Sequence, residues 1–383
     1  MTATITFFPV DNGDMTLIEL ESGKTILIDV NIRAAADDPD DPTRDVAKDL
    51  RKHLKRDHQG RFYVDVFLLS HPDQDHCSGL DRHFHLGPPG DHVGDKILIR
   101  EIWSSPLIFR RASKNHSLCD DAKKFNTEAK RRVARYRESG TGVGDGDRIL
   151  ILGRDENGKT DDLTGILVEV DSLITRVNGT PDPGLSARLL GPLPKSGDES
   201  EEDTLSKNHS SVILQFTITA VGGISRFLTG GDAEVAIWER LWDRHSQRTQ
   251  WLEYDLLQAP HHCSWHSLSY DSWTEKGEAA QVSEKARRAL SQADSGAHIV
   301  SSSKPIKDDD ADPPCIRAKR EYESILKPVT GKFLCTGEYP SEKHPAPMVF
   351  EIGRYGLSLK SASLAGPAVI TSPAIGGQPL PHG

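Results

Sequence analysis

The sequence predicts an α+β protein in which two β layers pack against each other and helices cover their outer faces. Two observations predict this class. Groups of short β-rich runs are separated by amphipathic helical stretches in both halves of the 383-residue chain. In addition, FYVDVFLLS at 62–70 is an almost uninterrupted apolar run, which is typical of a strand covered on both faces. A chain of this length can bury a sizeable core.

The elements of the first half follow from turn signals and periodicity. Asn12-Gly13 is a strong turn pair between TITFFPV and MTLIELE, so we expect a hairpin there and a strand at TILIDV. Residues 45–58 have apolar positions at helical spacing, and the strand at 62–70 leads into a short helix around SGLDRHF. A basic helical stretch from about 110 to 138 comes next.

A stretch of short strands and Gly/Pro turns follows at 149–193, and the second half then shows the same alternation of strands and helices as the first. We expect a mobile loop at 192–206. SVILQFTI and SRFLTG form a hairpin around Val221-Gly222-Gly223, and EVAIWERLW is an amphipathic helix. EYDLLQA and AHIVSSS are further strands. The tail at 363–383, rich in Gly, Pro and Ala, is expected to be disordered.

Composition restricts the class of protein. The net charge of −10 argues against non-specific nucleic-acid binding by the whole surface. No apolar run approaches the ~20 residues of a membrane span, so we expect no membrane segment. MTATITFFPV lacks the basic and apolar regions of a signal peptide. The five cysteines are odd in number and form no CxxC pair, which favours a reduced, cytoplasmic protein. The oligomeric state is unknown.

Charge is uneven along the chain. Residues 110–137 carry ten Lys or Arg against three Asp or Glu. Two interpretations stay open for this stretch. It lines a track for the phosphates of nucleic acid or a nucleotide-like substrate, or it is the solvated face of an amphipathic helix.

Histidines and aspartates follow the ends of several predicted strands. Rigid strands fix the backbone there, and the loops after them can project side chains into one cleft. Imidazole nitrogens and carboxylate oxygens suit zinc, and also manganese or iron, and a carboxylate such as Asp232 could bridge two ions. The candidate metal-binding residues at or near these strand ends are His71, Asp73, Asp75, His76, His209, Asp232, His261 and His262.

Four motifs in order carry a family resemblance. H-x-D-x-D-H-x-x-G at 71–79 resembles the metallo-β-lactamase signature H-x-H-x-D-H, with Asp73 in place of the second histidine. NHSSVILQF, FLTGGDAE and APHHCSWHS resemble the N-x-x-S, L-x-T-G-D and P-H-H-G-S-x-x-S motifs of one branch. That branch is the hydrolase domain of the DNA-uptake channel protein ComEC and its stand-alone relatives. FFPVDNGDMTLIE resembles the glycine-rich opening hairpin of the family.

The resemblance covers roughly residues 5–360 and implies a four-layer αββα metallo-β-lactamase sandwich. We therefore expect a single domain at 1–362, with halves at about 1–195 and 207–362. The basic helical stretch would be an insertion at about 104–148. The resemblance also implies two divalent metal ions, zinc or manganese.

The family's roles carry over to particular positions. His71 and Asp73 would serve the first ion. Asp75 and His76 would serve the second, with Asp75 also orienting the attacking water, and Asp232 would bridge. One histidine of the pair at 261–262 should ligate the second ion.

For that pair we favour His262 as the ligand, with His261 in a catalytic role beside the substrate or behind the ligands. His209 stands where the wider fold has its third-motif histidine, and both a ligand and a non-ligand role stay open for it. Asp232 has an alternative interpretation as the N-cap of a helix at 234–242.

Two departures from the branch pattern matter. Cys263 replaces the glycine of H-H-G-S, so this loop is a candidate for a different backbone conformation. The late S-x-x-x-N-x-Y-x-H-P motif keeps only its start at Ser301–Lys304 and lacks the histidine. Lys304 is then the candidate phosphate contact, which places it with Asp75 and His261 among the expected catalytic residues.

These features predict a binuclear metal-dependent hydrolase, a phosphodiesterase or nuclease that uses a metal-bound hydroxide. One alternative keeps the site but cleaves a lactone, thioester or other carboxylic ester. A second alternative is a non-catalytic, metal-stabilised binding module, which Asp73 and the absent late histidine motivate.

Overall fold

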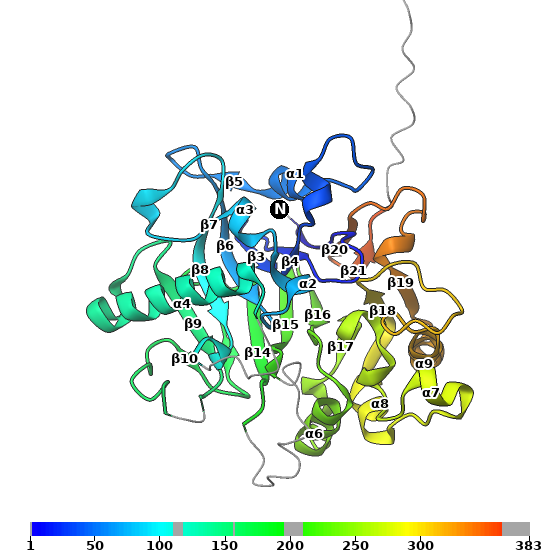
Figure 1. Cartoon of the computed structure of the whole chain (residues 1–383). Helices are drawn as coiled ribbons and strands as arrows, with labels where there is room; N and C mark the ends of the chain where they lie inside the picture. The colour runs from blue at the N-terminus through cyan, green and yellow to red at the C-terminus, as the bar shows by residue number, and fades with distance from the viewer. Residues whose placement is uncertain (1, 110–117, 156–157, 195–209, 362–383) are drawn as a thin grey trace, which may run out of the picture.

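Two large β-sheets form the centre of the molecule, and helices lie on both outer sides (Figure 1). The computed structural model describes the chain at 2–109, 118–155, 158–194 and 210–361. Within these ranges, one apolar cluster fills the space between the sheets, and another lies between each sheet and its helices. The layers therefore run helix, sheet, sheet, helix, which confirms the four-layer αββα sandwich.

The first sheet is mixed, with parallel strands β3, β6, β8 and β9 at its centre and antiparallel strands beyond β3. In spatial order its strands are β10 (Leu167–Val168), β9 (Arg148–Leu152), β8 (Ile97–Ser104), β6 (Phe62–Leu69), β3 (Thr25–Ile28), β2 (Thr16–Glu19), β1 (Ala3–Phe7), β20 (Met348–Gly353) and β21 (Gly356–Leu359). Two short strands of this sheet lie off that path: β5 (Lys55–Arg56) pairs with β6, and β7 (Phe84–His85) pairs with β8. The short strand β4 (Val30–Asn31) forms isolated bridges with Cys77 and Ser78.

The second sheet has a parallel half, β16 to β19, joined to antiparallel strands through the hairpin of β15 and β16. In spatial order its strands are β11 (Leu173–Ile174), β14 (Leu185–Gly191), β15 (Ile213–Ala220), β16 (Gly223–Leu228), β17 (Tyr254–Gln258), β18 (Ala293–Ser301) and β19 (Lys332–Cys335). A separate pair is formed by β12 (Arg176–Val177) and β13 (Thr180–Pro181).

Helices cover the two outer faces, as Figure 1 shows with α4 on one side and α6, α8 and α9 on the other. The first group consists of α1 (Val46–His53), α2 (Gln74–Cys77), α3 (Leu80–His83) and α4 (Asp120–Ser139). The second group consists of α6 (Val235–His245), α7 (Trp273–Lys276), α8 (Glu284–Leu290) and α9 (Ile316–Leu326).

The apolar strand β6 shows why this order of layers forms. Phe67 and Leu69 pack toward the helices, while Val66 and Leu68 pack toward the second sheet. Because successive side chains of a strand point to opposite faces, a strand with both faces covered is apolar at nearly every position. The exception in β6 is Asp65, which is buried and paired with Thr25 and Arg100. The run FYVDVFLLS is therefore a central strand of the sandwich.

Most of the predicted elements are confirmed. The opening hairpin is β1 with β2, and the second hairpin is β15 with β16. The helix expected within 45–58 is α1, whose N-cap Asp45 accepts a hydrogen bond from the backbone N–H of Lys48 at 2.8 Å. Residues 195–206 of the predicted loop and the tail at 363–383 lie outside the described residues.

The two sheets do not divide the chain where the two expected halves meet. Strand β14 at 185–191 belongs to the second sheet, although it precedes the expected boundary. The last strands, β20 and β21, return to the first sheet beside β1. The pairing of β1 with β20 therefore brings strands from the two ends of the described chain side by side in one sheet.

Helix α4 contains most of the described part of the basic stretch and packs on the first sheet. Its Phe125 and Ala129 are buried against the strands. Arg132 is buried too, and it donates to Glu128 at 2.7 Å and to the carbonyl of Ile99 at 2.9 Å. This arginine holds the helix to the sheet and cannot reach a nucleic acid.

Other arginines of α4 are also paired. Arg131 contacts Asp147 at 2.5 Å, and Arg137 contacts Asp162 at 2.7 Å. These pairs favour the amphipathic-helix interpretation of the stretch over a phosphate track. Residues 110–117 of that stretch lie outside the described residues.

Candidate metal centre

The candidate site lies where strand ends of both sheets meet. His71 follows β6 of the first sheet after one residue, and Asp232 follows β16 of the second. His261 and His262 come directly after β17, in the short helix η7 (Pro260–Cys263). Because these strands end at the same edge of the sandwich, their loops bring the side chains within about 4 Å of one another.

One group of side chains faces the Oδ2 atom of Asp232. His71 Nε2 lies 3.4 Å from this oxygen, and His261 Nε2 lies 3.7 Å from it. Asp73 joins the group through its Oδ2, which is 3.6 Å from His71 Nε2. Two imidazoles and one further carboxylate thus surround this side of Asp232.

A second group faces the other oxygen of the same carboxylate. His76 Nε2 lies 3.0 Å from Asp232 Oδ1, and His262 Nε2 lies 3.5 Å from it. Asp75 completes the group, with its Oδ2 3.3 Å from His262 Nε2. The two oxygens of Asp232 therefore separate two sets of donors, each with two imidazoles and one additional carboxylate.

Carboxylates behind the second group orient its histidines. Asp29 Oδ2 lies 2.8 Å from His76 Nδ1, and Asp14 Oδ1 lies 3.5 Å from His262 Nδ1. The carbonyl of Ser302 lies 3.2 Å from the same Nδ1. Partners at Nδ1 hold the proton there and leave the lone pair of Nε2 free to bind a metal.

Asp14 also belongs to a set of four buried residues whose donor atoms lie within 4.8 Å of one another, with His76, Asp232 and His262. Its contacts to both histidines are at Nδ1, the side away from Asp232. We therefore place Asp14 behind the ligands rather than among them.

The unpaired atoms of the cluster fit a cation. Nε2 of His71, His76 and His262 is buried and has no hydrogen-bond partner, and the same holds for Asp232 Oδ1. Although His76 Nε2 is 3.0 Å from Asp232 Oδ1, the angles do not make a hydrogen bond. Leaving buried polar atoms unpaired costs about 1–3 kcal/mol each. Divalent ions bound between these atoms would satisfy all of them, so the residues present fit a metal.

Electrostatics in the metal-free cluster favour protonated histidines. Burial by itself lowers the pKa of His262, but the carboxylates of Asp232 and Asp14 raise it to about 10. Burial opposes protonation of His76 as well, yet Asp232 and Asp29 raise its pKa well above the usual range. Burial raises the pKa of Asp75, but His262 and His76 more than offset this and bring it below its usual range. Protons thus hold the place that a cation would take.

The loop after β17 has an unusual backbone. His261, His262 and Cys263 have consecutive positive φ values of 50°, 53° and 68°. Such conformations are rare outside glycine and concentrate at functional sites. They turn both imidazoles toward Asp232. Cys263 takes the left-handed conformation that its glycine counterpart in the branch motif would favour, and its Sγ faces the carbonyl of Cys315 rather than the cluster.

Gly13 of the opening hairpin allows a close approach to the first motif. A Cβ atom here would lie 2.1 Å from the Asn31 side chain and 2.7 Å from the Asp75 carbonyl. The neighbouring backbone N–H of Asp14 donates to that carbonyl at 3.2 Å. The small residue lets this loop place Asp14 beside the histidines.

Most of the expected metal residues come together. His71, Asp73, Asp75, His76, Asp232 and His262 join the cluster, whereas His209 lies outside the described residues. Asp232 is not a helix cap, because the N-cap of α6 is Glu234. Lys304 is exposed, and its backbone N–H donates to Asn12 Oδ1 at 3.1 Å, next to the Gly13–Asp14 loop.

Two acidic residues beside the histidines, Asp14 and Asp29, are not among those expected from the sequence. Asp29 lies within the run TILIDV and comes directly after the strand at 25–28. It therefore follows a strand just as the expected ligands do, and this signal could have identified it. Asp14 lies between β1 and β2 and has no such signal apart from its place in the opening hairpin. Its proximity depends on how that hairpin packs against the loop after β6.

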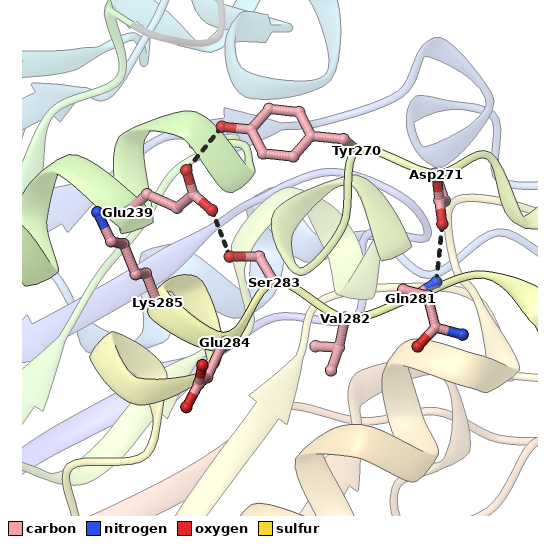
Figure 2. A pocket seen from close by; sticks show the side chains of 8 residues that line it. All are labelled: Glu239, Tyr270, Asp271, Gln281, Val282, Ser283, Glu284 and Lys285. Atoms are coloured by element: carbon pink, nitrogen blue, oxygen red, sulfur yellow. Dashed lines mark hydrogen bonds between the residues drawn. The ribbon is translucent and has the colours of Figure 1, made fainter.

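A second cavity, of about 400 Å³, lies between α6 and the segment that leads into α8 (Figure 2). Its polar groups contact one another: Tyr270 and Ser283 both donate to Glu239, at 2.9 and 2.5 Å. Asp271 accepts from the backbone N–H of Gln281 at 2.9 Å. None of the residues lining this cavity belongs to the histidine cluster.

Comparisons with known proteins add little to this geometry. No family model and no curated protein matches the sequence. Among solved structures, the chain is similar to that of unliganded yeast PDE1, with a TM-score of 0.42 and 11% identity over 88% of this chain and 98% of that one. A likeness this distant carries no argument about function.

No described helix combines the length and apolar character needed to cross a membrane, and the cytoplasmic location stays a prediction.

Proposed function

We propose that this chain is a metal-dependent hydrolase that binds two divalent ions and cleaves a phosphodiester. The observation that carries the proposal is the position of Asp232, whose two oxygens face two sets of histidine and aspartate donors. One set is His71, Asp73 and His261, and the other is Asp75, His76 and His262. A carboxylate between two such sets is the arrangement of a bridged binuclear site.

This assignment changes the expected role of His261. The sequence favours a catalytic role for it, but its Nε2 faces the same oxygen of Asp232 as His71 does. We therefore propose His261 as a ligand of the first ion. It supplies the imidazole that the first donor set lacks because Asp73 stands where the signature motif has its second histidine.

Ions held there would lower the pKa of a bound water and neutralise charge that develops on the substrate. Asp75 is the most exposed carboxylate of the two sets, and its low pKa keeps it ionised. It can therefore accept a hydrogen bond from a water and orient it, although it is a weak base. His71 and His262 are buried and exclude bulk water from behind the reacting atoms.

Two lysines beside the site support an anionic substrate. Lys304 and Lys307 line a cavity of about 370 Å³ together with Asn12 of the opening hairpin. Asp11 and Asp309 line it as well, and Asp11 is already paired with Arg33. Ser302 ties this segment to the cluster, since its carbonyl contacts His262 and its hydroxyl donates to the Gly13 carbonyl at 2.6 Å. Neither lysine forms an ion pair with another described residue. The cavity volume suits a nucleotide-like substrate.

The test uses chelator-treated protein reloaded with Mn²⁺ or Zn²⁺. We expect about two ions per chain and cleavage of bis-p-nitrophenyl phosphate. Asp75→Ala should abolish the cleavage, whereas the same change at Asp81, a half-exposed aspartate in the following helix, should not affect it.

Two results would contradict the proposal. Turnover of lactones or carboxylic esters, with none of the phosphodiester, would support the ester alternative. Metal binding without any turnover would support a non-catalytic module.

Lys304→Ala should raise KM for the phosphodiester with little effect on metal content.

A further inference from the structure

Two cysteines approach each other directly beside the metal centre. Cys77 is the last residue of α2 and follows His76, and Cys119 is the N-cap of α4. Their Sγ atoms are 3.5 Å apart, and both thiols are free. The contact joins the helix that holds Asp75 and His76 to the long helix on the outer face of the first sheet.

The two thiols differ in reactivity. The hydrogen bond with the Cys77 thiol lowers the pKa of Cys119 to about 6. Partial burial opposes this shift, and the backbone N–H of Ala122, which donates to Cys119 Sγ, adds to it. A large part of Cys119 is therefore thiolate near neutral pH, and its side chain is partly exposed. Low-pKa, accessible cysteines next to a second thiol are the ones that oxidants attack.

We propose that Cys77 and Cys119 form a redox modification site, which a hydroperoxide converts to a disulfide that weakens metal binding. In the first step the Cys119 sulfur attacks one peroxide oxygen, the O–O bond breaks, and the leaving oxygen takes a proton. In the second step the Cys77 sulfur attacks the resulting sulfenic acid, loses its proton and releases water. Two thiols and one hydroperoxide give one disulfide, one water and one alcohol, or a second water from hydrogen peroxide.

The disulfide must move α2. An S–S bond is about 2.05 Å long, so the two sulfurs have to approach by about 1.5 Å. Helix α4 is held in place by its buried face, and its Asp121 accepts from the backbone N–H groups of Gly79 and Asp81 at 2.9 and 2.8 Å. The four-residue α2 is the smaller element, so the displacement falls mainly on it.

Oxidation also removes a hydrogen bond inside the ligand loop. Cys77 Sγ lies 3.0 Å from the carbonyl of Asp73 and 3.5 Å from Cys119 Sγ, so its one hydrogen is shared between these two acceptors. A disulfide sulfur has no hydrogen to donate to either of them. Asp73, Asp75 and His76 all lie within four residues of Cys77. Loss of supporting contacts behind metal ligands typically lowers metal affinity about 10–100-fold, and we expect a loss of at least about tenfold here.

The other cysteines provide a matched control. Cys315 stands at the N-cap of α9 as Cys119 stands at that of α4, but its side chain caps no backbone N–H. Burial raises its pKa to about 11, so it remains a thiol at neutral pH. Among its described contacts there is no second sulfur at hydrogen-bonding distance.

The experiment treats the reduced full-length protein with hydrogen peroxide and maps disulfides by peptide mass spectrometry. Zinc affinity is measured by competition with a chromophoric chelator before oxidation, after it, and after reduction with dithiothreitol. We expect a 77–119 disulfide, loss of two free thiols, and a fall in zinc affinity that reduction reverses. Cys119→Ser should prevent all three effects, and Cys315→Ser should behave as the wild type.

A different disulfide, or oxidation that proceeds equally in Cys119→Ser, would overturn the proposed site. Formation of the 77–119 disulfide with unchanged zinc affinity would overturn its coupling to the metal centre. Neither measurement depends on hydrolysis, so the result is independent of the substrate proposed above.

Discussion

Replacing Asp14 by asparagine tests the division between ligands and supporting residues. The change removes one negative charge and keeps the side-chain shape. Asp14 is buried and contacts Nδ1 of His262 at 3.5 Å and of His76 at 3.7 Å. If it only supports these rings, the variant should still bind two ions per chain, but each less tightly.

The structure also limits the size of the effect. Loss of a partner behind a metal ligand lowers affinity about 10–100-fold, or about 1.4–2.7 kcal/mol. Both rings keep other partners in the variant: His76 keeps Asp29 at 2.8 Å, and His262 keeps the Ser302 carbonyl at 3.2 Å. We therefore expect the lower end of the range, about tenfold.

The assay is a zinc titration of metal-free protein against a chromophoric chelator, combined with elemental analysis. Asp11→Asn, in the same loop but half-exposed and paired with Arg33, is the matched control and should leave the affinity unchanged. A stoichiometry that falls to one ion in Asp14→Asn would show that Asp14 is a direct ligand. An unchanged affinity would show that it supports neither ring, and either result would refute the assignment.

Three further predictions follow from the same geometry. His261→Ala and His262→Ala should each reduce the metal content from two ions toward one, because they belong to different donor sets; elemental analysis that finds two ions in either variant would exclude that residue as a ligand. Because the pKa of His262 is about 10 without metal, ions must displace protons, so affinity should fall from pH 8 to pH 6; calorimetry in buffers of different ionisation enthalpy should detect proton release, and affinity that rises on acidification would contradict this. Arg132→Met should lower the free energy of unfolding by about 3 kcal/mol in a denaturant titration, the low end for a broken buried pair, because a second arginine still contacts Glu128; a change below about 0.5 kcal/mol would show that the buried pair does not support the fold.

The sequence reveals the parts of the site that follow apolar strands. The residues at 71–76 are dense and come directly after β6, and Asp232 and the pair at 261–262 each follow a strand of the second sheet. Because strand ends fix where a loop begins, such residues can be assigned to one edge of the fold before the structure is known. The almost uninterrupted apolar run of β6 likewise indicates that both faces of this strand are covered.

Other parts depend on information that local sequence does not contain. The role of His261 follows from three successive residues in the left-handed conformation, and no propensity predicts that conformation for His-His-Cys. The buried position of Arg132 depends on which face of α4 meets the sheet. A count of basic residues cannot separate this arginine from the exposed ones, whereas helix packing can.

The departure from the family signature at Asp73 leaves both donor sets complete, because His261 compensates for it. The chain has a carboxylate where the signature has a histidine, yet His261 brings an imidazole to the same oxygen of Asp232. Both donor sets then contain two imidazoles, one carboxylate of their own and a share of Asp232. We infer a site richer in oxygen ligands than one with three histidines around one ion. Oxygen ligands suit manganese better than they suit softer ions, so the exchange at Asp73 widens the choice of metal beyond zinc. A centre of this composition would hold both ions next to the segment that carries Lys304, where we propose that a phosphodiester binds.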